Sequence, residues 1–469
     1  MDRRVFLARA AAAGGALAAT PCRAGSAAGV TKRPGKPRGT RPNVVVVVND
    51  DMRATDWRAL PKTQKELQGG SWYPQFFSTL PICTPARVSL LTGMYAHNHH
   101  VLDNIGSETV AGYNAFLQNG LEEVSLPVIL QNAGYYTGLV GKFMHGYDMN
   151  SRQPKGWNRW VARSSGGYTG FDLMIDGVNS RFSKREYATD VLARYALEFI
   201  ANAPADRPFF LHFSPTAPHA PYVPAKRHRN RYPGAVVPRD GSFNEEDVSD
   251  KPALLAAQPL LTPEQIAEID RSEQLRLQML AATDEAIVAL IQSLRKSGRL
   301  ENTCFFIMSD NGAVLGQHRL PSSKGLPYDP IVRIPMLAWG RPFRQPSVGR
   351  LCSHADIGPT VAELAGTSMP GADGKTLLRP NLRDFVPIQI HASVVSAGGV
   401  GLRDYRSMYF EYTSGEKEYY DHRRDPRELD NMLRTGGPNP PEITLDLPSP
   451  EQLSARLAQV STCRGSTCP

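Results

Sequence analysis

The sequence predicts an α/β protein in which a large, mixed and mostly parallel sheet lies between helices, with a smaller C-terminal α+β subdomain. Two observations indicate this fold class. Unbroken apolar runs, typical of strands buried on both faces, alternate with helical patterns along residues 42–370. From about residue 371 the apolar runs become shorter and strand-like, and a helical pattern follows them. We therefore expect a main domain over 42–370 and a C-terminal subdomain over 371–469.

The chain before residue 42 has the composition of an export signal followed by a linker. Arg3 and Arg4 precede an Ala-rich apolar stretch that ends near small residues, which predicts a twin-arginine signal peptide over 1–28. Residues 29–41 hold five basic residues and no acidic one among Pro and Gly, which is typical of a basic flexible linker. The twin-arginine translocase is thus an expected partner, and we predict a secreted, periplasmic or cell-envelope protein.

The net charge of +8 gives little information about partners, because most of it belongs to these two segments. The signal carries four Arg and one Asp, and the linker accounts for the remaining excess. The folded body is then near neutral, and we expect no nucleic-acid partner. The apolar part of the signal is too short to span a bilayer, and we expect no later segment long enough to act as a membrane anchor.

The first element of the body is a predicted strand at 43–48, a run of Asn and five valines without alternation. Two further apolar runs of the same kind predict buried strands at 208–213 and 304–308. The remaining expected elements are helices at 125–133, 187–203 and 274–297, strands at 406–412 and 418–420, and a final helix at 451–460.

Polar side chains follow each of the three buried strands. Asp50 and Asp51 end the first, His219 comes shortly after the second, and Asp310 and Asn311 end the third. In open α/β sheets ligands bind at the carboxyl ends of the strands, so we expect these side chains to converge on one site. The carboxylate and amide oxygens are hard ligands, which favour calcium or magnesium over a soft metal.

One short segment indicates the chemistry. The sequence Cys-Thr-Pro-Ala-Arg at 83–87, with Leu-Leu-Thr-Gly at 90–93, resembles the signature of the type I, formylglycine-dependent sulfatases. This resemblance implies an alkaline-phosphatase-like sulfatase fold. It also implies that a formylglycine-generating enzyme oxidises Cys83 to 3-oxoalanine (formylglycine), whose hydrated aldehyde attacks the sulfate ester. The start of a helix and Arg87 would both stabilise negative charge at that point.

The resemblance extends to a metal site and to groups that bind sulfate. The family pairs an early Asp-Asp with a later Asp-Asn and normally holds calcium, which implies the ligands Asp50, Asp51, Cys83, Asp310 and Asn311. Local sequences that match the family's around its sulfate-binding and proton-transferring residues complete the predicted catalytic set: Cys83, Arg87, Lys142, His145, His219 and Lys324. Either His219 or Lys324 could protonate the leaving oxygen.

Three features concern the position of the chain within that family. Ala313 and Val314 replace an aromatic residue and a histidine that close relatives often carry, and His145 lies one position later than the histidine of many members. The run His-Asn-His-His-Val at 97–101 resembles the N-acetylglucosamine-6-sulfatase and bacterial arylsulfatase branch. Outside the site, we expect Cys304 to be buried and Cys463 and Cys468 to form a disulfide after export.

The sequence therefore predicts an enzyme that hydrolyses aryl or carbohydrate sulfates. One alternative is a phosphodiester or phosphonate monoester hydrolase of the same superfamily, because sulfate and phosphate esters share a tetrahedral shape. A second is a non-catalytic protein that binds sulfated glycans, which applies if Cys83 is never oxidised.

Overall fold

The computed structural model describes residues 41–380, 383–393, 396–434 and 447–469. The predicted signal peptide and all but the last residue of the predicted linker lie outside the described residues. Residues 41–469 belong to one compact unit. A domain boundary at 370/371 stays a prediction.

The main sheet has nine strands in the order β2-β10-β9-β1-β8-β4-β5-β6-β7. Its five central strands, from β9 to β5, run parallel to one another, and the strands at both edges are antiparallel. The fold class is thereby confirmed. The strands are β1 Asn43–Asn49, β2 Ser71–Trp72, β4 Tyr136–Gly141, β5 Arg159–Gly166, β6 Phe171–Ile175, β7 Val178–Phe182, β8 Phe209–Ser214, β9 Thr303–Ser309 and β10 Met336–Trp339.

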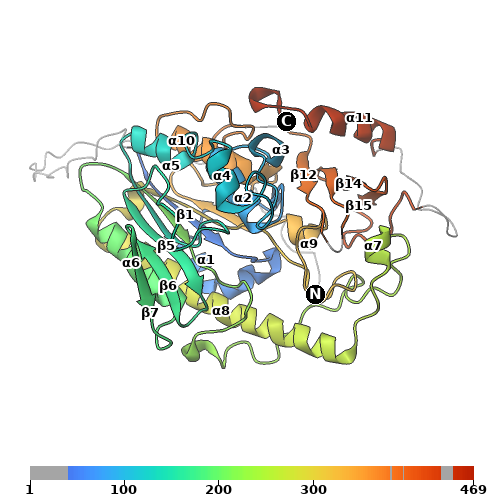
Figure 1. Cartoon of the computed structure of the whole chain (residues 1–469), viewed down its shortest axis with the longest axis horizontal. Helices are drawn as coiled ribbons and strands as arrows, with labels where there is room; N and C mark the ends of the chain where they lie inside the picture. Colours follow the sequence, from blue (N-terminus) through green and yellow to red (C-terminus); the bar gives the residue numbers. More distant parts are fainter. Residues whose placement is uncertain (1–40, 381–382, 394–395, 435–446) are drawn as a thin grey trace, which may run out of the picture. The chain divides into compact units, whose positions relative to one another are not determined.

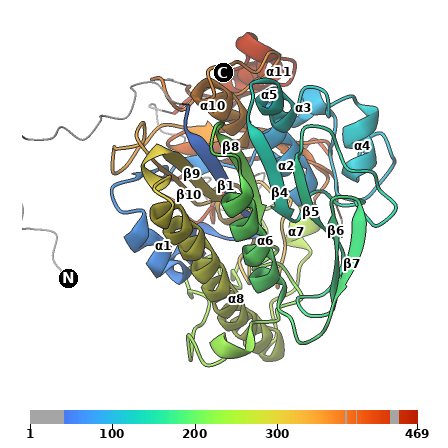
Figure 2. The same cartoon turned by 90° about the vertical axis from the view of Figure 1, so that its left-hand side faces the viewer.

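The valine run of β1 is buried on both faces because helices cover both sides of the sheet. Val44, Val46 and Val48 pack into a core with α2 (Cys83–Thr92), α5 (Leu126–Asn132) and α10 (Ile357–Leu364). Val45 and Val47 pack into a second core with α6 (Ala188–Asn202) and α8 (Pro263–Lys296). Figure 2 shows α6 and α8 on one face of the sheet and α2, α5 and α10 beyond it. Each fully buried valine contributes about 1.5–3 kcal/mol, so this strand anchors the sheet.

Helix α8 begins eleven residues earlier than the sequence predicted, because Thr262 caps it and Pro263 occupies its first position. It is also the one helix in the described part of the chain that is long and apolar enough to cross a membrane, although no segment of that length and character was expected after the signal. Of its most apolar window, 78% is buried inside the protein. The helix is therefore accounted for as a core helix that packs on α6 and the sheet.

The C-terminal part contains a four-stranded antiparallel sheet of β12 (Val386–Ile390), β13 (Gly399–Arg403), β14 (Ser407–Tyr412) and β15 (Lys417–Asp421). Helix α11 (Pro450–Val460) packs on it (Figure 1). The expected disulfide between Cys463 and Cys468 is present. Cys304 is buried, as expected.

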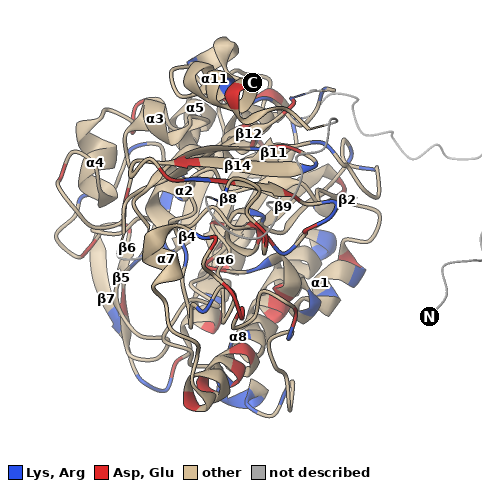
Figure 3. Ribbon diagram, turned by 90° about the vertical axis from the view of Figure 1, so that its right-hand side faces the viewer, with Lys and Arg blue, Asp and Glu red and all other residues tan. Residues whose placement is uncertain are grey.

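Short elements connect these layers, and acidic and basic segments are interspersed along the ribbon (Figure 3). The connecting elements are η1 Ala54–Ala59, α1 Pro61–Glu66, β3 Phe76–Phe77, α3 Ala96–His99, α4 Gly112–Gln118, η2 Lys226–His228, α7 Ala253–Ala256, η3 Leu300–Asn302, α9 Asp329–Val332, β11 Cys352–Ser353, η4 His354–Asp356 and η5 Gly465–Thr467.

Candidate active site

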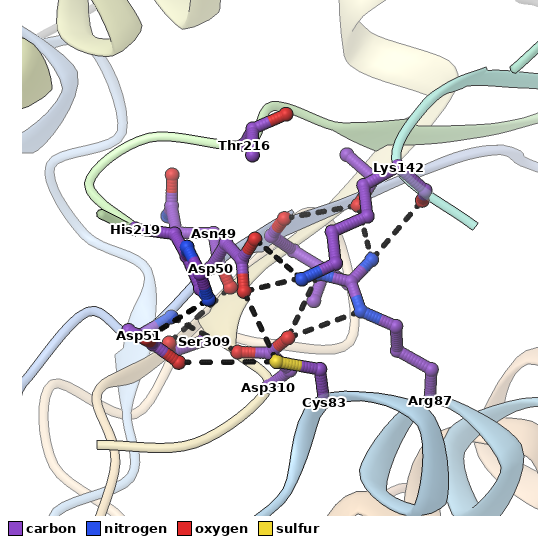
Figure 4. A network of polar contacts seen from close by, with 12 residues as sticks. Asn49, Asp50, Asp51, Cys83, Arg87, Lys142, Thr216, His219, Ser309 and Asp310 are labelled. Atoms are coloured by element: carbon purple, nitrogen blue, oxygen red, sulfur yellow. Dashed lines mark hydrogen bonds and ion pairs between the residues drawn. The ribbon is translucent and has the colours of Figure 1, made fainter. Parts of the chain in front are cut away.

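The carboxyl ends of the central parallel strands meet at one edge of the sheet, where most of the predicted site residues lie. Asp50 and Asp51 follow β1, Asp310 and Asn311 follow β9, and Lys142 follows β4. The loop after β8 brings His219 to the same edge, and Figure 4 shows the side chains of Asp50, Asp51, Lys142, His219 and Asp310 around the sulfur atom of Cys83. Parallel pairing of consecutive strands therefore produces the convergence that the sequence predicted.

Cys83 is the first residue of α2, and its side chain has no exposed surface. Its Sγ atom lies 3.4 Å from Asp50 Oδ1, 3.9 Å from Asp51 Oδ1 and 3.0 Å from Lys324 Nζ. Burial raises the pKa of the Cys83 thiol to about 12, although Lys142 and Lys324 act against this rise. The unmodified thiol is therefore neutral at physiological pH and a poor nucleophile.

Arg87 lies one helical turn after Cys83 and is 2% exposed. Its Nε and Nη2 atoms donate to Asp310 Oδ2 at 3.0 and 2.8 Å, and Nη1 donates to Ser214 Oγ at 2.5 Å. The other oxygen of Asp310 accepts from the backbone N–H groups of Asp51 and Asn311, at 3.1 and 2.8 Å. The Arg87–Asp310 pair thus connects α2 to the ends of β9 and β1 at the site.

Two lysines neutralise the other carboxylates. Lys142 Nζ lies 2.7 Å from Asp50 Oδ2, and Lys324 Nζ lies 2.6 Å from Asp51 Oδ1. Burial alone would lower the pKa of each lysine, but the surrounding acidic groups, with the facing carboxylate foremost, together outweigh burial, and each pKa lies above its ordinary value. Burial acts to raise the pKa of each aspartate, but the nearby basic groups, with the facing lysine foremost, together outweigh burial, and each pKa is lowered. All four groups are therefore charged at neutral pH.

The position of Lys142 depends on the glycine before it. Gly141 has φ +126°, and a Cβ atom there would lie 1.9 Å from the carbonyl oxygen of Ser214. Only glycine allows β4 to approach β8 this closely, while the backbone N–H of Lys142 donates to that same oxygen at 2.8 Å. The glycine of the Gly-Lys pair is thus a structural requirement of the strand end.

The two predicted histidines occupy the outer side of the cluster. His219 Nε2 lies 3.6 Å from Asp51 Oδ2. His145 Nδ1 lies 3.4 Å from Thr84 Oγ1, at the start of α2. Burial, followed by the charge of Lys142, lowers the pKa of His145 to about 4, so this ring is neutral at physiological pH. His145 can exchange hydrogen bonds there but carries no charge to a substrate.

The oxygen-rich centre of the cluster is suited to a divalent cation. Ligand atoms of Asp50, Asp51, Cys83 and His219 all lie within 4.8 Å of one another. Asn311 Oδ1 is buried without a hydrogen-bond partner, while its Nδ2 donates to Asp51 Oδ1 at 2.6 Å. A buried acceptor oxygen without a donor is what a bound cation would satisfy. His219 was predicted as a catalytic residue only, yet it lies within this group.

A cavity of about 380 Å³ opens beside the cluster. Lys142, His145 and His219 line it, together with residues from the hairpin between β5 and β6. Arg163 and Thr216, which were not among the predicted site residues, also line the cavity. In the sequence, Thr216 was marked only by its place shortly after the predicted strand at 208–213, which many polar residues share, and no strand was predicted around Arg163.

The structure brings every predicted site residue to this region. The three strand ends that the sequence predicted to converge do so, and α2 places Cys83 and Arg87 against them. Their chemical roles stay predictions. His318 lies outside this cluster: it is buried, and its Nδ1 atom is 2.6 Å from Glu245 Oε2.

Comparison with known proteins gives one family. The Sulfatase family model matches residues 42–367. An arylsulfatase from Volvox carteri is 32% identical over 363 residues, which are 70% of this chain and 56% of that protein. An N-acetylglucosamine-6-sulfatase from Capra hircus is 31% identical over 358 residues, which are 72% of this chain and 64% of that protein. The chain thus spans less than two thirds of the length of both relatives.

Solved structures give the same fold. A protein in complex with its substrate, D-glucosamine-2-N,6-O-disulfate, has a TM-score of 0.69 and 20% identity, and the match covers 84% of this chain and 94% of that one. The phosphonate monoester hydrolase of Agrobacterium radiobacter has a TM-score of 0.63 and 20% identity, with 84% and 91% covered. At these identities the likeness concerns the fold alone.

Proposed function

Because the chain belongs to the sulfatase family, we propose that it hydrolyses sulfate esters of small molecules or glycans, with an oxidised Cys83 as the nucleophile. The observation that carries this proposal is the position of Cys83. Its side chain lies at the first residue of α2, 3.4 Å from Asp50 and 3.0 Å from the Lys324 ammonium. A reacting oxygen at this point would face both a source of positive charge and a set of metal ligands.

The nucleophile in this proposal is formylglycine, the aldehyde that replaces the Cys83 thiol, in its hydrated form with two hydroxyl groups on one carbon. One hydroxyl oxygen attacks sulfur, the bond from sulfur to the ester oxygen breaks, and the alcohol leaves with a proton. The second hydroxyl then loses its proton, the bond from carbon to the sulfated oxygen breaks, and sulfate departs as the aldehyde forms again. This route avoids the hydrolysis of a stable sulfated side chain.

The proposed resident ion is calcium, with magnesium as the alternative, held by Asp50, Asp51, Asp310, Asn311 and oxidised Cys83. When bound, the ion would neutralise charge on the sulfate and lower the pKa of the hydroxyl groups on oxidised Cys83. The charges of the chain support this. The charges of three carboxylates and three basic side chains cancel in the cluster; the six residues are Asp50, Asp51, Asp310, Arg87, Lys142 and Lys324. A divalent cation would then compensate the negative charge of a sulfate monoester and that of one ionised hydroxyl group.

The geometry favours His219 over Lys324 as the proton donor to the leaving oxygen. His219 lines the cavity in which a leaving group would lie, whereas Lys324 contacts Cys83 and Asp51 on the inner side of the cluster. His219→Ala should therefore slow the hydrolysis of sugar sulfates, which have poor leaving groups, far more than the hydrolysis of 4-nitrophenyl sulfate. Equal losses on both substrates would instead favour Lys324 as the acid.

The burial of Cys83 supports oxidation before folding. The side chain has no exposed surface, so a formylglycine-generating enzyme could not reach it in the folded protein. The twin-arginine route carries folded proteins, so oxidation in the cytoplasm would precede export. The disulfide between Cys463 and Cys468 fits an oxidising compartment after export.

Mass spectrometry of the Cys83 peptide, taken from the exported protein, tests the nucleophile directly. Conversion of the thiol to the aldehyde replaces sulfur and two hydrogen atoms with one oxygen atom, so the peptide should be lighter than its sequence mass. A peptide with an intact cysteine in the exported protein would contradict the proposal and would favour a non-catalytic protein that binds sulfated glycans.

A phosphonate monoester hydrolase is the second candidate, because solved enzymes of that activity share the fold. Turnover of matched aryl sulfate and aryl phosphonate esters separates the two. The sulfatase proposal predicts a higher kcat/KM on the sulfate, and a higher value on the phosphonate would reverse the assignment.

A further inference from the structure

One more parallel strand, β5, ends at the edge of the sheet that carries the candidate active site. It is the fifth of the parallel strands, and it pairs with β4 next to Gly141. Its carboxyl end therefore lies beside Lys142. The pairing with β6 shifts register between Arg163 and Ser165. Such an irregularity turns a side chain out of the regular alternation, and it is often found beside an active site.

Arg163 is a cation that makes no ion pair within the described part of the chain. Among the described residues, no carboxylate lies within ion-pair distance of it. Its Nη2 atom donates to the carbonyl oxygens of Gly166 and Gly167, the latter at 2.9 Å, whereas its Nη1 atom is buried and has no hydrogen-bond partner. Burial lowers the pKa of Arg163, and Tyr168 and Asp50 oppose this only in part. The guanidinium still keeps its charge, because the ordinary pKa of arginine is so high.

The surroundings of Arg163 favour a bound anion. The guanidinium lies over the rings of Tyr168 and Phe171, at 5.9 and 5.8 Å from their centroids, which leaves its free edge in a low-dielectric setting. Among the described residues that line the 380 Å³ cavity there is no Asp or Glu. Thr216 lines the same cavity, and its hydroxyl oxygen is also buried without a partner.

The hairpin between β5 and β6 is hydrogen-bonded to the loop after β8 that carries His219. Tyr168 Oη lies 2.8 Å from the carbonyl oxygen of Thr216 and 2.7 Å from that of His219. Arg163 and Thr216 are therefore held in a fixed position relative to His219, as a subsite requires.

We propose that Arg163 and Thr216 form a second anion-binding subsite, which holds a further sulfate or carboxylate group on the same sugar as the sulfate ester that is hydrolysed. This inference rests on the proposed function and narrows it to substrates with two anionic groups. Arg163 contributes its Nη1 donor and its charge, and Thr216 contributes its hydroxyl group. Among the described residues neither donor has a hydrogen-bond partner, and an anion bound in this cavity would supply one.

The test is equilibrium binding to the calcium-loaded Cys83→Ala protein, which cannot turn over its ligand. Titration calorimetry compares a hexosamine 6-sulfate with the same hexosamine carrying a second sulfate on the ring. Hydrogen bonds to a charged group are worth enough to predict that the disulfate binds at least about tenfold more tightly. Arg163→Gln should remove most of that difference and should change monosulfate binding by less than about threefold.

Three further variants separate a binding role from a structural one. Arg163→Lys keeps the charge and should retain part of the preference, and Thr216→Val should remove a smaller part. Arg159→Gln is the matched control, because Arg159 lies on the same strand but pairs with Asp176 and Glu198. It should leave the preference unchanged. Equal affinity for the two sugars, or a preference that survives Arg163→Gln, would overturn the subsite.

The subsite and the proposed function can fail independently. The oxidised protein is assayed separately on 4-nitrophenyl sulfate, which carries a single anionic group. Absence of turnover there would reject the sulfatase proposal, while the calorimetric comparison would still decide for or against the subsite.

Discussion

The buried ion pair between Arg87 and Asp310 provides the sharpest stability test. Both side chains are at most 2% exposed, and Arg87 places two donors on one oxygen of Asp310. Arg87→Met would leave Asp310 as a buried carboxylate with backbone donors only. Loss of one member of such a pair costs about 3–5 kcal/mol, because the desolvated charge that remains is uncompensated.

The free energy of unfolding is measured by urea denaturation in the presence of a chelator, so that no cation replaces the arginine. At a slope of about 3 kcal/mol/M, the loss corresponds to a midpoint lower by about 1–1.7 M. Addition of Asp310→Asn should restore part of the stability, because the stranded charge is then gone while one acceptor oxygen stays for the backbone N–H groups of Asp51 and Asn311.

Arg227→Met is the matched control. Arg227 pairs with Asp190 and Glu285, but its side chain is 44% exposed, so the expected loss is below about 1 kcal/mol. If Arg87→Met lost as little stability as Arg227→Met, the reasoning from burial would be refuted. A double variant no more stable than Arg87→Met alone would refute it too.

Three more predictions follow from the same structure. Unoxidised Cys83 should resist alkylation by iodoacetamide at pH 8 in the folded protein and react after denaturation, because burial raises its pKa to about 12; equal rates would show that the thiol is accessible. Calcium should raise the Tm of the protein, and Asp51→Asn should reduce that rise, since it removes a charged ligand; an undiminished rise would place the ion elsewhere. Burial raises the pKa of Glu245 to about 8, so the folded state holds a proton that the unfolded state releases near pH 4.5, and stability falls as pH rises through that interval. His318 lies beside Glu245 and contributes an opposite slope only below its unfolded pKa of 6.5. The urea midpoint should therefore fall between pH 6.5 and 8 in the wild type and change less in Glu245→Gln. An equal fall in both proteins would contradict the assignment of this pH dependence to Glu245.

The local elements of this chain could be predicted from short-range patterns. Unbroken apolar runs gave β1, β8 and β9 to within one residue at either end, because burial on both faces leaves no room for polar side chains. The start of α8 was missed because its first turns are mostly polar, and only the cap at Thr262 marks them. The proximity of Asp50, Asp51, Asp310 and Asn311 followed from one general rule about parallel sheets.

The sequence by itself determined the class of fold and the place of Cys83 at the start of a helix, since each depends on residues that are neighbours along the chain. Only the tertiary structure decided that Lys324 faces Asp51 and that Arg163 has no acidic partner among the residues that the structure describes. Such facts depend on which side chains from distant segments come within a few ångströms of one another. Whether a charge is paired is a property of that packing, and no pattern along the chain encodes it.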